Sequence, residues 1–160
     1  MALRFGRAVG GAAFAAILAA SLAVGLAGCS WGPEPATTMA RPTVTVEMLV
    51  GNWGLAAYHQ DADRARTETQ ARAQCNKPFV ITKGPNGGVM MYLADSATPT
   101  ELVIKVGDGK TYIGPSTDPA GGPSDRLIVS ADNNEFVTQW VDPEVASRYG
   151  TMVYARCGAK

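Results

Sequence analysis

The chain has 160 residues, including 18 Gly, 10 Pro and only four Phe, a length that fits one domain of ordinary size. Its 14 basic and 14 acidic side chains give a formal net charge of zero, which argues against a nucleic-acid partner bound through its phosphates. One histidine and three cysteines offer little material for a catalytic or metal centre. We therefore predict no cofactor and no metal.

Residues 1–28 have the layout of an export signal. Arg4 and Arg7 give the segment a basic start, residues 8–27 carry no charge, and small residues precede Cys29. The uncharged run is about as long as a helix that spans a bilayer, so a retained transmembrane anchor is one alternative. A signal peptide that happens to end near a cysteine is another.

The tetrapeptide Leu26-Ala27-Gly28-Cys29 resembles the lipobox of bacterial lipoproteins. The resemblance implies cleavage before Cys29 and a diacylglycerol on its sulfur, so that acyl chains hold the protein durably on a membrane. In the enteric form of this pattern an Asp after the cysteine favours retention in the inner membrane, so the resemblance, with Ser30 at that position, implies the outer membrane, with the protein facing the periplasm. In a Gram-positive or mycobacterial cell the anchor would lie on the outer face of the cell membrane.

Residues 29–42 are predicted to be a tether between the lipidated cysteine and a folded domain over residues 43–160. The segment contains three prolines and almost no apolar periodicity. Such proline-rich segments are extended and semi-rigid.

Once Cys29 is acylated, Cys75 and Cys157 remain as an even number in an oxidising compartment, and we predict that they form a disulfide. Neither cysteine belongs to a C-x-x-C motif. A reactive thiol or a metal pair is therefore the less supported alternative.

Short runs of apolar β-forming residues, separated by turn residues, fill most of the domain. They predict eight strands joined mostly by short loops, the pattern of an antiparallel sandwich or an up-and-down barrel. An irregular loop is expected over residues 114–125 and a helical turn over residues 142–150. The expected strands are 50–58, 79–82, 89–93, 101–106, 111–113, 126–130, 135–141 and 151–156.

One short helix is predicted after the first strand, over residues 61–75, because this stretch lacks Gly and Pro and is rich in Ala, Arg, Gln and Glu. Asp61 is expected to cap the helix. Arg64, Glu68 and Arg72 are spaced to pair along its exposed face. The face toward the sheet is expected to consist of Ala62, Ala65, Thr69 and Ala73.

The segment Gly51-Asn52-Trp53-Gly54-Leu55 resembles the G-x-W of lipocalins and related calycin barrels. It also resembles the G-x-W-x-L of small bacterial protease inhibitors of barrel fold. The resemblance implies an all-β, mainly antiparallel, eight-stranded up-and-down barrel. It further implies that Trp53 plugs the closed end and that Arg156 packs across the indole ring, with an attraction of about 0.5–2 kcal/mol.

No catalytic residue is predicted. His59 lies beside Asp61 and Asp63, but a single histidine at a strand-to-helix junction is weak support for a metal site. The chain also lacks a nucleophile turn of the G-x-S-x-G kind. We expect a protein that is not an enzyme, with a small hydrolase built on His59 as an alternative.

The predicted function is that of a membrane-anchored envelope lipoprotein whose barrel binds a small apolar ligand or another envelope protein. Any binding mouth is expected beside the 61–75 helix and the 114–125 loop, formed by Tyr58, His59, Tyr112 and Trp140. The resemblance to the inhibitors implies an alternative, a periplasmic protease inhibitor in which residues 36–45 enter a protease cleft.

Overall fold

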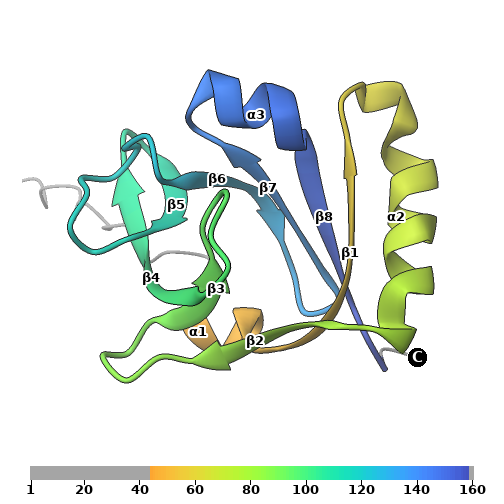
Figure 1. The fold of residues 1–160 in the computed structure, drawn as a ribbon, viewed down its shortest axis with the longest axis horizontal. Coiled ribbons are helices and arrows are strands. Elements are labelled where there is room, and N and C mark those ends of the chain that lie inside the picture. Colours follow the sequence, from red (N-terminus) through yellow and green to blue (C-terminus); the bar gives the residue numbers. More distant parts are fainter. Residues whose placement is uncertain (1–43, 159–160) are drawn as a thin grey trace, which may run out of the picture. The chain divides into compact units, whose positions relative to one another are not determined.

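The computed structural model describes residues 44–158. Within them the chain forms a closed antiparallel barrel of eight strands, in which each strand pairs with the next and β8 returns to β1 (Figure 1). The predicted fold class is therefore confirmed. The strands are β1 (Gly51–Tyr58), β2 (Phe79–Lys83), β3 (Val89–Tyr92), β4 (Pro99–Gly107), β5 (Lys110–Gly114), β6 (Arg126–Ala131), β7 (Glu135–Trp140) and β8 (Thr151–Arg156).

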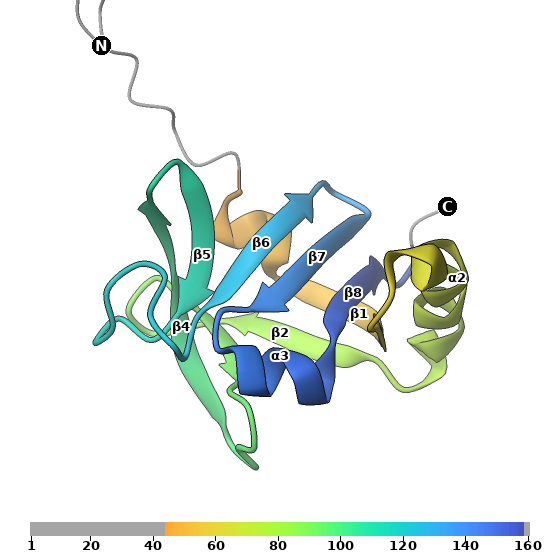
Figure 2. The same ribbon diagram turned by 90° about the horizontal axis from the view of Figure 1, so that it is seen from above.

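Three α-helices accompany the barrel: α1 (Val46–Leu49), α2 (Arg64–Ala73) and α3 (Pro143–Tyr149). Short 3-10 turns, η1 (Asp61–Asp63) and η2 (Gln74–Asn76), flank α2. Figure 2 shows α2 outside the barrel beside β1 and β8, the strands that it contacts. No helix between residues 44 and 158 is long and apolar enough to cross a bilayer.

Two details of the predicted helix after β1 are wrong. Asp61 does not cap it: Gln60 precedes η1, Asp63 precedes α2, and neither side chain makes a capping hydrogen bond. The face toward the barrel consists of Thr67 and Ala71, which are buried, whereas the four predicted residues are exposed. Thr67, Ala71 and Cys75 are spaced four apart on one side of a helix, and the disulfide at Cys75 turns that side toward the barrel.

The helix α2 lies very close to β1 because β1 has a glycine at the contact. A Cβ at Gly54 would overlap the carbonyl oxygen of Ala71 and come within 3.3 Å of the Cys75 sulfur. The predicted disulfide is present, and it joins Cys75 to Cys157, which directly follows β8, with 5.4 Å between the Cα atoms. The disulfide thus fixes α2 to the barrel beside the close backbone contact between α2 and β1.

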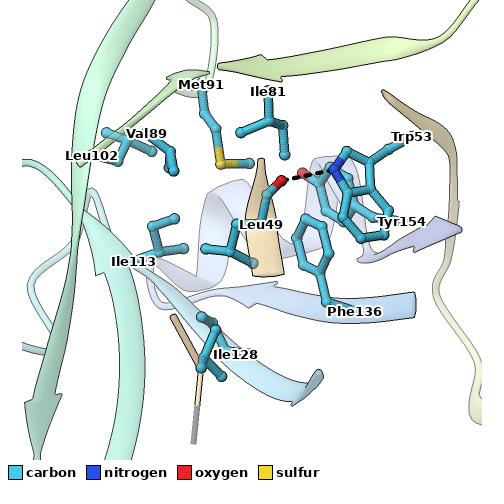
Figure 3. Close-up of a cluster of buried hydrophobic side chains, with 11 residues drawn as sticks. Leu49, Trp53, Ile81, Val89, Met91, Leu102, Ile113, Ile128, Phe136 and Tyr154 are labelled. Carbon is cyan, nitrogen blue, oxygen red and sulfur yellow. Dashed lines mark hydrogen bonds between the residues drawn. The ribbon is translucent and has the colours of Figure 1, made fainter. Parts of the chain in front are cut away.

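The barrel interior near α1 is filled with side chains (Figure 3). Phe136 stacks on Tyr154 with 4.1 Å between ring centroids and meets the edge of Trp53 at 4.7 Å. Apolar side chains from α1 and the remaining strands complete this core: Leu49, Ile81, Val89, Met91, Leu102, Ile113 and Ile128.

The two ends of the barrel differ. The α1 end holds the start of β1, the end of β8 and the tight turns between β2 and β3, β4 and β5, and β6 and β7. The α3 end holds α3, the β3–β4 connection and the loop predicted over residues 114–125, which carries no helix or strand after Gly114, the last residue of β5 (Figure 1). The longer connections thus gather at the α3 end, and binding residues are found disproportionately on such connecting loops.

Candidate functional site

The α1 end is closed by an indole ring with a guanidinium laid over it. Trp53 is fully buried, and its Nε1–H donates to the carbonyl of Leu49 over 2.8 Å. The Cζ atom of Arg156 lies 4.1 Å from the centroid of the Trp53 ring. Trp53 and Arg156 are directly opposite one another on β1 and β8, so the pairing register itself brings them together.

Backbone carbonyls hold Arg156 in this position. Its Nη1 donates to Val50 over 3.1 Å and its Nη2 to Met48 over 2.6 Å, and its Nε donates to Asn133. A Cβ at Gly51 would come within 2.5 Å of Nη1, and Gly51 has φ +150°. The glycine of the G-x-W motif therefore leaves room for the arginine.

The α3 end contains three hollows. The α3 groove, of about 410 Å³, is lined by Tyr58, His59, Trp140 and residues of α3. The rim groove, of about 320 Å³, lies between the β3–β4 connection, residues 123–124 and α3. The inner cavity, of about 230 Å³, is lined by Phe79, Tyr92, Leu93, Ala94, Asp95, Ser96, Arg126, Trp140, Tyr149, Met152 and Tyr154.

The four residues of the predicted mouth are only partly brought together. Tyr58, His59 and Trp140 line the α3 groove, and Trp140 also lines the other two hollows. Tyr112 lies elsewhere, with its ring 3.5 Å from the position that a Cβ on Gly121 would occupy. On β5 the neighbouring Ile113 belongs to the interior core, and alternation along a strand therefore turns Tyr112 to the outside.

Arg126 is a residue of this end that the sequence pattern did not single out. It starts β6 opposite Trp140 on β7 and is only 3% exposed. Its Cζ lies 4.1 Å from the centroid of the Trp140 ring. The arrangement repeats the Arg156–Trp53 pair at the other end of the barrel, but here the pair lines a cavity. Burial lowers the pKa of Arg126 from its usual value.

The rim of the inner cavity carries a second polar cluster. Both carboxylate oxygens of Asp95 accept from Arg148, over 3.2 and 2.8 Å, and Oδ1 also accepts from the Tyr149 hydroxyl over 2.5 Å. Hydrogen bonds from Tyr149 and then Arg148 lower the pKa of Asp95. This cluster ties α3 to the β3–β4 connection.

A buried ion pair fixes the 114–125 loop. The Nζ of Lys105 lies 2.6 Å from Oδ1 of Asp125, which is fully buried. The same ammonium donates to the carbonyls of Pro115 and Asp118 over 3.0 Å each, and Oδ2 of Asp125 accepts from the backbone N–H of Gly121 over 2.9 Å. The loop beside the rim groove is therefore held at both ends.

Among residues 44–158, no group of three or more His, Cys, Asp or Glu side chains is placed to bind a metal. The predicted signal peptide, the lipobox-like tetrapeptide with Cys29 and the predicted tether over residues 29–42 lie outside the described residues.

No family model matches the chain, and comparison with curated proteins and with solved structures finds no match. The class of protein follows from the fold. It is an eight-stranded antiparallel barrel consistent with the calycin-like type, with one end closed by Trp53 and Arg156 and the other hollowed beside Arg126 and Trp140.

Proposed function

We propose that this protein is a membrane-anchored lipoprotein of the bacterial cell envelope and that its barrel is a non-enzymatic module that binds a small ligand at the α3 end. The observation that carries the binding role is the asymmetry of the barrel. Buried side chains fill the interior near α1, whereas a cavity of about 230 Å³ lined by aromatic side chains lies near α3. Small-molecule sites are typically concave and apolar with a few polar groups.

The cysteines support the envelope location. Cys75 and Cys157 are joined, and structural disulfides are typical of oxidising compartments and rare in the cytosol. Cys29 is then the remaining cysteine of three, and it is the one in the lipobox. We propose that Cys29 carries the lipid, that the protein faces the periplasm from the outer membrane, and that the outer face of the cell membrane is the alternative.

Membrane fractionation tests the anchor. We expect the wild-type chain to be released from membranes only by detergent, with an intact mass that corresponds to residues 29–160 plus acyl groups. Cys29→Ser removes the only acyl acceptor of the lipobox and should abolish both the processing and the added mass. An unprocessed, lipid-free wild-type chain would exclude the lipoprotein proposal.

Native mass spectrometry tests the binding role. We expect protein purified from its own membrane to retain a non-covalent small molecule. Ala94 lines both the rim groove and the inner cavity, so Ala94→Trp should fill the space and abolish the adduct. The matched control is Ala65→Trp, at an exposed position of α2, which should keep it. Equal retention by the two variants would place any ligand elsewhere.

A protease inhibitor is the alternative function. Of the segment 36–45, Val44 is buried in the core and Thr45 caps α1 by accepting from the Met48 N–H over 3.4 Å. Residues 36–43 would therefore have to enter the protease cleft. Titration of secreted metalloproteases with the whole chain tests this role, and unchanged hydrolysis at micromolar protein would exclude it. A hydrolase built on His59 is a second alternative, which a fully active His59→Ala variant would remove.

A further inference from the structure

Among residues 44–158, Arg126 carries a positive charge in the barrel interior without an acidic partner. Its Nη2 donates to the carbonyl of Tyr92, but Nε and Nη1 are buried and have no hydrogen-bond partner among the described residues. A buried charge without a partner is strongly unfavourable. Buried polar groups that lack partners are rare in folded proteins, and each calls for an explanation such as an unseen ligand or ion.

Two carboxylates, one adjacent to Arg126 in the chain and one lining the same cavity, bind other partners. Asp125 precedes it in the chain but binds Lys105 and the Gly121 N–H. Asp95 lines the same cavity, yet both of its oxygens accept from Arg148. Neither of these carboxylates therefore neutralises Arg126, and Asp95, being paired, adds little net negative charge to the cavity.

The indole of Trp140 also lacks a hydrogen-bond partner among the described residues. Its Nε1 is buried, and its ring lies against the guanidinium of Arg126. Indole Nε1 and both free guanidinium nitrogens are donors only. What this pair lacks is therefore acceptor atoms, which a carboxylate supplies together with the missing negative charge.

The rest of the inner cavity is suited to an apolar or aromatic group. Phe79, Tyr92, Met152 and Tyr154 line it, and Phe79 meets the rings of Tyr92 and Tyr154 edge-on at 5.8 and 5.7 Å. The volume of about 230 Å³ equals roughly eight water molecules at about 30 Å³ each. A compact molecule fits this space, whereas a long lipid is too large to be enclosed in it.

We propose that the inner cavity binds a small organic acid, a molecule with one carboxylate and a compact apolar or aromatic body, and that Arg126 pairs with the carboxylate while Phe79, Tyr92 and Met152 contact the body. This inference rests on the proposed binding function and names its ligand class. The indole N–H of Trp140, which stacks on Arg126, donates to the same carboxylate. The two side chains together form the polar part of the site.

The test is calorimetric titration of the whole chain in phosphatidylcholine nanodiscs, with empty nanodiscs as the blank. The probes are phenylacetate and hexanoate, each compared with its neutral amide, which has nearly the same shape. We expect saturable binding of at least one acid to one site, about tenfold or more tighter than its amide, because charge-assisted hydrogen bonds are the stronger ones. This comparison is made on the wild-type protein and does not depend on a variant.

Arg126→Met keeps the unbranched apolar stem of the side chain and removes the charged guanidinium group. We expect it to lose about tenfold or more in affinity for the acid, with binding of the amide nearly unchanged. Arg66→Met, at an exposed position of α2, is the control and should bind like the wild type. If Arg126→Met does not fold, Arg126→Lys replaces it and should bind the acid more weakly than the wild type does, because an ammonium lacks the planar fork of arginine.

Three results would overturn the proposal: no saturable binding of either acid, equal affinity of an acid and its amide, or undiminished acid binding by Arg126→Met. The binding role and the ligand class are tested by different outcomes. Loss of the native adduct in Ala94→Trp, together with no preference for acids, would keep the binding role and reject the ligand class. Absence of any adduct would reject the binding role itself.

Discussion

The guanidinium of Arg156 lies 4.1 Å from the centre of the Trp53 ring, and this contact closes the barrel where its first and last strands meet. The same arginine donates to backbone carbonyls of the segment that leads into β1. One side chain near the end of the chain thereby fixes α1, β1 and the Trp53 ring together.

Arg156→Met should destabilise the barrel by about 2–4 kcal/mol, since it removes the cation–π contact and hydrogen bonds from a charged donor. Urea unfolding followed by Trp fluorescence measures the change. Arg66→Met, which breaks only an exposed i,i+3 ion pair, should cost less than about 0.5 kcal/mol. Equal losses for the two variants would mean that Arg156 does not hold the closed end.

The disulfide between Cys75 and Cys157 closes a loop with a sequence separation of 82. In the chain-entropy model such a crosslink is worth about 4.5 kcal/mol, and less where the native state is strained. We expect the double variant Cys75→Ser/Cys157→Ser to lose about 2–5 kcal/mol in urea unfolding. Reduction of the wild type should lower its stability to a similar value, and it should leave that of the variant unchanged.

Lys105 neutralises Asp125, which has no exposed surface. Lys105→Met leaves this carboxylate buried and unpaired, so we expect a loss of about 3–5 kcal/mol in the free energy of unfolding. Lys105→Met/Asp125→Asn should recover part of the loss because the uncompensated charge is gone. Lys110→Met, at an exposed lysine of β5, is the control. A Lys105→Met variant as stable as this control would contradict the role of the ion pair.

Glu101 and Glu135 should respond to acid in opposite directions. Burial alone would raise the pKa of Glu101, but hydrogen bonds from the backbone N–H of Gly88 and from Asn86 lower it below the ordinary 4.5. The stability that ionised Glu101 adds is full above about pH 4.5 and is lost as the pH falls through the lower folded-state pKa. The wild type should therefore be more stable to unfolding than Glu101→Gln at neutral pH, and this difference in stability should disappear in acid.

For Glu135, burial and then the charge of Glu68 raise the pKa. The folded state then binds a proton more tightly than the unfolded state does, so this residue adds stability as the pH falls toward 4.5. Urea unfolding of the wild type, Glu101→Gln and Glu135→Gln at neutral and acidic pH measures both effects. Parallel pH dependence of the two variants would contradict the opposite shifts.

The barrel could be predicted from the sequence because short runs of apolar β-forming residues recur between turn residues. The side of the helix that faces the barrel could not be predicted, since Ala62, Ala65 and Ala73 are as apolar as Ala71. The disulfide and the glycine at the β1 contact decide that Ala71 faces the barrel. The site at the α3 end was only partly predictable. Arg126 was missed because an arginine at the start of a strand is usually exposed, although its alternation with Ile128 placed both on the inner face.

The measurement that tests the binding site most directly is NMR of the tryptophan indole N–H groups during titration of the whole chain with phenylacetate. The indole N–H of Trp53 already donates to Leu49, whereas that of Trp140, beside Arg126, has no partner in the part of the chain that the structure describes. We predict that the Trp140 signal shifts and saturates while the Trp53 signal stays in place. A shift of Trp53 with Trp140 unmoved, or no shift of either, would contradict a ligand site at the α3 end.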